Sequence, residues 1–429
     1  MKRLLALFLS LVMVMAMCVV SANAEGRKLV FSVEESGTSA LNKPYFEDKI
    51  LEAFPNDTIE FVYFADAKEL QVQVAGGAGP DIVFLSGPTS AMAYAKSSRL
   101  ISLNSYAEKY GWADIFYDWA YNACLFQGEL YSLPNSFEGM GIYYNMDVLA
   151  ELGAEIPSTM EELVALCEKC QENGIIPFSY GTSNYIGVHG WTYSILYNCY
   201  AGPDAVKAGL EATASWNASP LKDAVQLMAD WWQKGYFCDR KSQAVSSDDM
   251  IPMFAEGETA MILDGTWATG DLMNLYPDLN WAMDEMVDMG KGRIVPLAIG
   301  GCYAINASCA DPDFAAEVLN YVFTDGVDNN IAAVREAGIQ PYPVKAVTGS
   351  DFEGGDEHFV KTYDVLLTAQ AENRIGYCGW CFFPSTVHSY LKSNMDALYL
   401  QTMDIETFCT DLDKLCAEEV ANGTAPILP

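Results

Sequence analysis

Three tryptophans beside glycines are the residues of this sequence whose type and spacing suggest ligand chemistry. Trp191, Trp267 and Trp380 each follow a glycine by one or two positions. One face of a sugar ring exposes C–H groups that pack on an aromatic ring, and the sugar hydroxyls need carboxylates and amides as hydrogen-bond partners. Because most aromatic side chains pack in a core, core packing is the competing interpretation for each tryptophan taken alone.

The motifs of common enzymes are missing from the sequence. It contains no G-x-S-x-G, H-E-x-x-H, P-loop or G-x-G-x-x-G pattern. The three histidines, His189, His358 and His388, are far apart in the chain. Adjacent carboxylates such as Glu161 and Glu162 are typical of the exposed start of a helix, where the helix dipole favours them. The sequence therefore predicts a binding protein with no catalytic residues, no metal site and no cofactor.

The N-terminus has the pattern of a signal peptide over residues 1–24. Two basic residues precede an apolar run, 4–20, and small residues follow it up to Ala24. A membrane span is the competing interpretation, but the run is short for a bilayer of about 30 Å and no basic cluster follows it. Lipid anchoring at Cys18 is a minority alternative, since Met17 stands where a small residue is expected. We expect an exported protein, in the periplasm or on the outer face of the cell membrane.

The length and charge of the full chain limit its fold and its partners. At 429 residues the chain is long enough for two domains. Its net charge of −33 argues against nucleic acid and anionic lipid as partners, and makes a neutral or cationic ligand easier to hold than an anionic one. Eleven cysteines follow the predicted signal peptide, including two C-x-x-C pairs, Cys167/Cys170 and Cys378/Cys381. We interpret these pairs as buried apolar residues rather than metal ligands.

Apolar strands and helices alternate near the start of the mature chain. Strands are expected at 28–33, 59–64 and 82–85, with helices at 43–53 and 67–74 between them. This alternation predicts a parallel sheet covered by helices, which is an α/β fold. Further helices are expected at 88–97, 160–172, 219–234, 247–256, 312–323 and 326–336 and from 355 onward, and further strands within 129–147, 260–263 and 294–306.

An ordered set of motifs resembles a known family. The segment 254–261, F-A-E-G-E-T-A-M, followed by G-T-W-A at 265–268, is similar to the family 1 extracellular solute-binding proteins of bacterial ABC importers, of the carbohydrate, maltose-binding-protein-like type. Segments 79–84, 131–134, 143–147 and 156–163 follow the order of the same family. The resemblance covers most of the mature chain.

The resemblance implies a two-lobed, type II periplasmic-binding-protein-like fold, in which each lobe is a mainly parallel sheet flanked by helices. We expect residues 25–134 and 297–340 in the N-terminal lobe, and 135–296 and 341–429 in the C-terminal lobe. Hinge crossovers are expected near 133–137, 296–301 and 338–344. The family further implies a monomer that binds a carbohydrate between its lobes and delivers it to a membrane permease.

Site residues follow from the same resemblance. Trp267 and Trp380 correspond to aromatic platforms of the family, and Glu138 to a carboxylate that binds sugar hydroxyls. Ser86 stands where relatives can have an aromatic residue, which argues against a maltodextrin ligand. The remaining expected ligand contacts are the loop after the first strand and a cleft segment: Glu34, Glu35, Ser36, Tyr185, His189 and Trp191.

Two other classes of function remain open from the sequence. A binding protein for a polyamine or peptide would use Glu34, Glu35 and Glu138 to pair with cationic groups. A secreted carbohydrate-active enzyme would use a cleft carboxylate such as Glu138 in catalysis.

Overall fold

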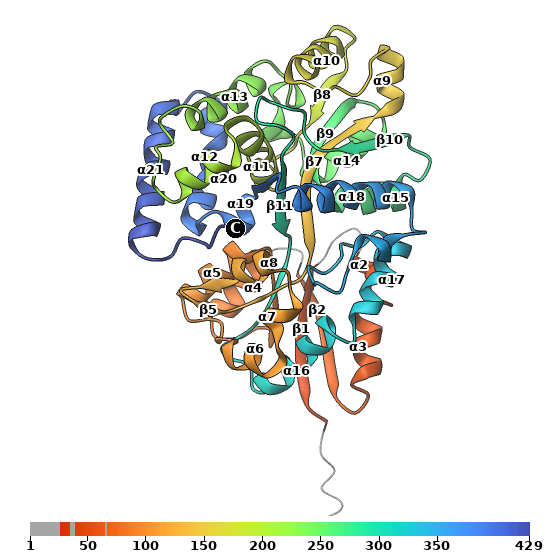
Figure 1. Ribbon diagram of the computed structural model, residues 1–429, viewed down its shortest axis with the longest axis vertical. Coiled ribbons are helices and arrows are strands. Elements are labelled where there is room, and N and C mark those ends of the chain that lie inside the picture. Colours follow the sequence, from red (N-terminus) through yellow and green to blue (C-terminus); the bar gives the residue numbers. More distant parts are fainter. Residues whose placement is uncertain (1–25, 35–38, 65–66) are drawn as a thin grey trace, which may run out of the picture.

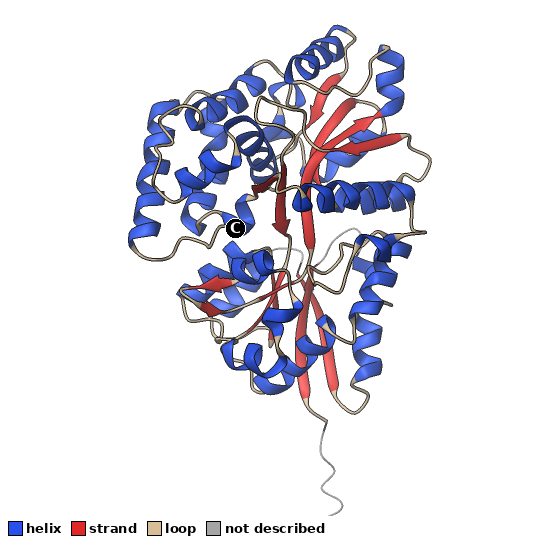
Figure 2. Ribbon diagram, viewed as in Figure 1, coloured by secondary structure: helices blue, strands red, loops and turns tan. Residues whose placement is uncertain are grey.

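Two lobes, one above the other in Figure 1, make up the part of the chain that the computed structural model describes, residues 26–34, 39–64 and 67–429. Each lobe contains one large sheet with helices packed around it, and the strands of the two sheets approach each other at the middle of the molecule (Figure 2). The predicted signal peptide with Cys18, and the predicted ligand contacts Glu35 and Ser36, lie outside the described residues.

The lower sheet of Figure 1 defines the first lobe and has the strand order β2-β1-β3-β12-β6. Strand β1 (Lys28–Glu34) pairs in parallel with both β2 (Thr58–Phe64) and β3 (Ile82–Leu85), as the alternating pattern predicts. Strand β12 (Cys302–Ile305) runs antiparallel to β3 and to β6 (Leu133–Pro134).

The upper sheet defines the second lobe. Its order is β13-β11-β7-β9-β8, and β10 also pairs with β7. Strand β7 is its central strand, and all nine of its residues are buried, including the polar side chains of Glu138 and Asn145. The strands span β7 (Phe137–Asn145), β8 (Ile176–Ser179), β9 (Thr259–Gly265), β10 (Trp281–Asp284), β11 (Val295–Ile299) and β13 (Ile375–Tyr377).

Both sheets are mixed, so the prediction of mainly parallel sheets is wrong. In the second lobe only β11/β13 and β8/β9 are parallel pairs, while β7 runs antiparallel to β9, β10 and β11. The reason is the path of the chain. It enters the second lobe along β7 and leaves along β11, so these neighbouring strands must run in opposite directions. The two-lobed α/β architecture itself is as predicted.

The chain passes between the sheets at residues 135–136, between β6 and β7, and at Gly300–Gly301, between β11 and β12. A Cβ atom on Gly300 would lie 1.8 Å from Oε1 of Glu138, so a larger residue there would have to displace the Glu138 carboxylate. Segment 343–345 still pairs with the first lobe, because Tyr117 N–H donates to the Pro343 carbonyl at 3.0 Å. The lobe boundaries predicted above stay a prediction, and β11 remains in the second sheet to Ile299.

The helices surround both sheets. Helices α10 and α16 have the predicted bounds, and a capping box formed by Thr159 and Glu162 fixes the start of α10. The helices are α2 (Ser39–Asn42), α3 (Glu47–Ala53), α4 (Ala67–Ala75), α5 (Pro88–Lys96), α6 (Asn104–Tyr110), α7 (Trp112–Ile115), α8 (Asp118–Ala123), α9 (Met146–Leu152), α10 (Met160–Glu172), α11 (Val188–Ala201), α12 (Pro203–Leu210), α13 (Leu221–Gln233), α14 (Met250–Ala255), α15 (Trp267–Leu275), α16 (Pro312–Phe323), α17 (Val327–Ala337), α18 (Glu357–Ala371), α19 (Gly379–Phe382), α20 (Ser385–Tyr399) and α21 (Ile405–Ala421), with short 3-10 turns at Cys238–Arg240, Ser242–Ala244, Ser247–Asp249 and Gly349–Phe352 and a hairpin of β4 (Leu125–Phe126) and β5 (Glu129–Leu130). Within the described ranges, no helix has the length and apolar character needed to cross a bilayer.

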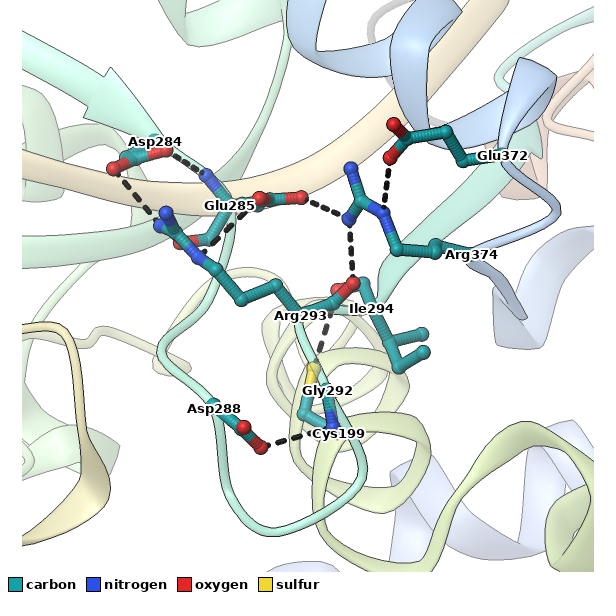
Figure 3. Close-up of polar contacts among 9 residues, drawn as sticks. All are labelled: Cys199, Asp284, Glu285, Asp288, Gly292, Arg293, Ile294, Glu372 and Arg374. Carbon is teal, nitrogen blue, oxygen red and sulfur yellow. Dashed lines mark hydrogen bonds and ion pairs between the residues drawn. The ribbon is translucent and has the colours of Figure 1, made fainter.

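An ion-pair network holds the connection between β10 and β11 (Figure 3). Arg293 pairs with Asp284 at 2.8 Å and with Glu285 at 3.3 Å. Arg374, just before β13, pairs with the other oxygen of Glu285 at 2.5 Å and with Glu372 at 2.7 Å, and it donates to the Arg293 carbonyl at 2.6 Å. The network therefore ties the start of β11, the strand that leads to Gly300, to the edge of the second sheet.

Candidate ligand-binding site

A cavity of about 290 Å³ lies between the two lobes. Its lining combines indole rings, carboxylates and basic side chains, drawn from segments that are far apart in the sequence. The lining residues are Ser86, Ser90, Glu138, Tyr185, Gly187, Trp191, Trp267, Asp271, Gly300, Gln340, Trp380, His388 and Lys392. Six residues predicted as ligand contacts thus meet at one place: Ser86, Glu138, Tyr185, Trp191, Trp267 and Trp380.

Four aromatic side chains form a continuous row along the cavity. The ring centroids of Trp191 and Trp267 are 5.3 Å apart, and those of Trp267 and Trp380 are 6.1 Å apart. Tyr185 extends the row, with its ring 5.9 Å from that of Trp191. The three indoles are half-buried, so each one packs on protein and still presents surface to the cavity. Such a row is suited to the apolar face of a ring-shaped ligand.

Local backbone geometry places the central indole. Trp267 is the first residue of α15 and lies directly beyond the end of β9. A Cβ atom on Gly265 would lie 2.1 Å from the Trp267 ring, so the glycine lets the ring fold back over the backbone. The G-x-W pattern in the sequence therefore has a steric cause, because the glycine makes room for the indole two residues later.

The first lobe closes the Trp380 side of the cavity. Gly87 precedes α5 with a φ of 76°, and a Cβ atom there would lie 2.9 Å from the Trp380 ring and 2.5 Å from its carbonyl oxygen. Thr89 on α5 donates to the Phe383 carbonyl at 2.9 Å. At the other end of α5, Lys96 pairs with Glu419 on α21 at 2.8 Å. Helix α5 therefore joins the two lobes along this edge.

Glu138 lies where the cavity meets a smaller one of about 70 Å³. Its side chain is 7% exposed and accepts a hydrogen bond from the Ser136 hydroxyl at 3.0 Å. Glu138 and Gln340 line both cavities, and Glu138 belongs to β7, the strand by which the chain enters the second lobe. A ligand that contacts Glu138 therefore lies beside the passages between the lobes.

A second carboxylate, Asp271, lines the cavity and was not predicted. It lies one turn after Trp267 on α15, so the two side chains share one face of the helix. Burial raises the pKa of Asp271 to about 6. Asp264, at the end of β9, is more deeply buried, and burial raises its pKa to about 8, against the opposing effect of the bond from the Gly265 N–H at 2.8 Å.

Two basic residues were also missed. His388 and Lys392 lie one turn apart on α20 and line the same cavity. Burial, together with the positive charge of Lys392, holds the pKa of His388 well below its usual value. Burial lowers the pKa of Lys392. The signal in the sequence was the i, i+4 spacing of the two residues, which has meaning only once the helix and the face it presents are known.

His189 does not line the cavity, contrary to the prediction. Its ring is fully buried in the second lobe, with Nδ1 2.6 Å from the Tyr180 hydroxyl and Nε2 3.3 Å from an Asp396 oxygen. The reason is the phase of α11: residues two positions apart in a helix point about 200° apart, so Trp191 faces the cavity and His189 the core. Of the predicted loop 34–36, only the backbone of Glu34, at the end of β1, is within the described residues.

The side chains that line the cavity offer stacking surfaces, hydrogen-bond acceptors and hydrogen-bond donors. In the described part of the chain, no three histidine, cysteine or acidic side chains lie together as a metal site would require. The indoles offer stacking surfaces, Glu138 and Asp271 offer hydrogen-bond acceptors, and His388 and Lys392 offer donors. The arrangement can hold a ring that is apolar on its faces and polar around its edge.

Known proteins resemble the chain in sequence. The family model described as bacterial extracellular solute-binding protein matches residues 35–329. The multiple sugar-binding protein of Streptococcus mutans is 23% identical over 57% of this chain and 64% of its own length. The maltodextrin-binding protein of Bacillus subtilis is 26% identical over 46% and 47%, and an uncharacterized ABC transporter extracellular-binding protein of Pyrococcus horikoshii is 23% identical over 55% and 52%. The chain thus spans about half to two thirds of the length of these relatives.

Solved structures resemble it over nearly the whole chain. A chitin oligosaccharide binding protein has a TM-score of 0.77 at 20% identity, over 93% of this chain and 100% of its own. The solute-binding protein RafE in complex with raffinose has a TM-score of 0.70 at 17% identity, over 92% and 99%. At these identities the similarity establishes the fold, and the predicted type II two-lobed fold is confirmed.

Proposed function

The chain belongs to the family of bacterial extracellular solute-binding proteins, and from that membership we propose that it captures a sugar or oligosaccharide between its lobes and delivers it to the permease of an ABC importer. Relatives named for sugars, and the resemblance to oligosaccharide-binding structures, support the carbohydrate class. Export to the outer face of the membrane and a monomeric state belong to the same proposal.

One observation carries the proposal: the row of Trp191, Trp267 and Trp380 beside the carboxylates of Glu138 and Asp271. The indoles cover the C–H faces of pyranose rings, and each carboxylate accepts hydrogen bonds from hydroxyls at the ring edge. Three indoles in one row suit a ligand of more than one ring.

The residues that line the cavity lie on both lobes, and this position explains how a ligand would be captured. Ser86 and Ser90 belong to the first lobe, whereas the indoles belong to the second. A ligand that touches both sets favours the closed arrangement, because only then are all its contacts made. The closed form is the one we expect the permease to recognise. The cavity carboxylates then act as hydrogen-bond acceptors, not as a catalytic pair, so we expect bound oligosaccharide to be recovered unchanged.

A thermal-shift screen of the chain from Glu25 onward tests the proposal, using mono- and oligosaccharides, polyamines and peptides. A ligand that binds only the folded state raises the Tm according to its concentration relative to Kd. We expect a sugar to raise the Tm, and Trp267→Ala to remove the shift. Leu275→Ala, on the exposed face of the same helix, is the matched control and should keep it.

Three outcomes contradict the proposal. A polyamine or peptide that stabilises the parent and Trp267→Ala chains equally, with no response to any sugar, would replace the carbohydrate assignment. A sugar shift that survives in Trp267→Ala would remove the indole row from the site. Shortened oligosaccharide in the recovered ligand would indicate an enzyme.

A further inference from the structure

Two hydrogen-bond donors in the cavity have no role in the stacking and carboxylate contacts of the proposed function, on which this inference rests. His388 and Lys392 lie on one face of α20, at the side of the cavity where α20 faces α5 of the first lobe. Glu138 and Asp271 are on β7 and α15. The cavity therefore has a donor side and acceptor groups on other elements.

Hydrogen bonding fixes which nitrogen of His388 carries the proton. Nδ1 of His388 lies within hydrogen-bond distance of the Tyr193 hydroxyl, which is fully buried. No other described group accepts from this hydroxyl, so the phenol must donate to Nδ1 if its own proton is to be satisfied. Nε2 of the neutral ring then carries a hydrogen. Because His388 lines the cavity, we assign this N–H as its donor to a ligand.

Lys392 is a partly buried cation with no partner among the described residues. No hydrogen bond or ion pair joins its ammonium group to a side chain in that part of the chain, and burial alone shifts its pKa, downward. A buried charge is costly unless an opposite charge or several acceptors compensate it. Compensation for Lys392 is therefore expected from the ligand.

We propose that the preferred ligand is an acidic sugar, whose carboxylate accepts hydrogen bonds from Nζ of Lys392 and Nε2 of His388. The ring of this uronate stacks in the indole row, and its hydroxyls donate to Asp271 and Glu138. The chain's net charge of −33 opposes an anion at long range, but exposed charges are screened beyond about 8 Å at physiological salt. The nearby donors of His388 and Lys392 therefore determine the preference for an acidic over a neutral sugar.

Titration calorimetry with matched sugars tests this inference. The pairs are galacturonate and galactose, glucuronate and glucose, and short oligogalacturonides and galacto-oligosaccharides. We expect the acidic member of at least one pair to bind about 10- to 100-fold more tightly, as a charge-assisted bond in a partly buried site allows. Lys392→Gln should abolish that difference and Lys392→Arg should retain much of it.

Lys361→Gln is the matched control, since Lys361 is an exposed lysine of α18 outside the cavity lining. It should leave the preference unchanged, and thermal melts should show that all three variants fold. Neutral sugars binding as tightly as uronates would overturn the acidic-sugar inference and leave the proposed function standing. A uronate preference that persists in Lys392→Gln would overturn the role of Lys392. Binding of neither acidic nor neutral sugars would overturn the proposed function as well.

Discussion

Asp264 and Asp271 lie on either side of Trp267 in the sequence, and burial raises the pKa of both carboxyl groups, to about 8 and about 6. In the unfolded chain the pKa of such a group is about 3.9. The folded state therefore holds the proton more tightly than the unfolded state. The contribution of each group to stability is greatest below about pH 4 and is lost as pH rises toward the folded pKa.

Asp264→Asn should remove one part of this pH dependence. Between about pH 4 and 8 the free energy of unfolding of the parent chain should fall relative to that of the variant. The slopes of the two curves of free energy against pH should differ by at most about 1.4 kcal/mol per pH unit. The amide oxygen of asparagine can still accept from the Gly265 N–H. Urea unfolding from pH 5 to 9 measures the effect, and Asp325→Asn, on an exposed turn, is the control. Parallel curves for the parent chain and Asp264→Asn would contradict the prediction.

Single residues differ in how far the sequence could predict their place. Trp267 could be selected for a local reason, because Gly265 makes room for its ring. The same pattern selected Trp191 and Trp380, although the glycines before them make room for Tyr193 and His388 and not for the indoles. Asp271 and Lys392 could not, because their access to the cavity depends on which helical face turns inward. His189 shows the converse, since it lies two positions from Trp191 yet points into the core.

At the scale of elements, α5 is the helix on which the closed edge of the cavity depends. Gly87→Ala would introduce a Cβ atom into the Trp380 backbone and strain a positive φ. Gly202 also precedes a proline at the start of a helix, and its φ of 93° and ψ of 146° are similar to the 76° and 167° of Gly87. A Cβ atom on Gly202 would meet only the Lys291 side chain, at 3.5 Å, so Gly202→Ala measures the backbone strain without a steric conflict. We expect Gly87→Ala to lower the free energy of unfolding by at least about 1 kcal/mol more than Gly202→Ala, and to weaken ligand binding. Urea unfolding and calorimetry of both variants give the comparison, and equal losses would mean that α5 does not pack closely on Trp380.

The network around Glu285 gives a prediction for the loop between β10 and β11. Arg374→Met removes two of its ion pairs and the bond to the Arg293 carbonyl, while the stem of the side chain remains. We expect faster amide exchange over residues 285–294. We also expect the free energy of unfolding to fall by about 1–2 kcal/mol, because Glu285 keeps only its ion pair with Arg293. Hydrogen-exchange mass spectrometry reports the region, and Arg335→Met on the exposed part of α17 serves as the control. Unchanged exchange in 285–294 would show that the loop is held by packing.

Elements with strong local signals were predictable. The capping residues of α10 and the Asp311-Pro312 start of α16 mark their helices in the sequence. Helix α11 was missed because it is buried on nearly all sides and lacks an apolar stripe. The antiparallel pairing of β7 with β9 and β11 was missed because it depends on the order in which the chain visits the two lobes.

For the whole molecule, the cysteines offer a test of the folded state. All eleven described cysteines are free, and ten are buried. Burial and the nearby charge of Asp81 raise the pKa of the remaining one, Cys309, to about 12, so little thiolate is present at neutral pH. A thiol reagent should therefore react slowly with the folded chain from Glu25 onward, and with eleven thiols after unfolding. Fewer than eleven would indicate a disulfide, and peptide mapping should first examine Cys124 and Cys302, whose sulfurs are 3.9 Å apart.

The division of the second lobe between two distant segments has a consequence for the order of synthesis. Strands β7 to β11 are made in the middle of the chain, but α18 to α21, which complete that lobe, are made last. Lys96, near the beginning, meets its partner Glu419 only when the final helix is present. A nascent chain released before α21 would therefore leave Lys96 without its ion pair and expose the apolar faces of α12, α13 and α20 that α21 contacts, the kind of surface that holding chaperones recognise. The packing of α5, α12, α13 and α20 is thus completed only by a helix that is made late in this sequence.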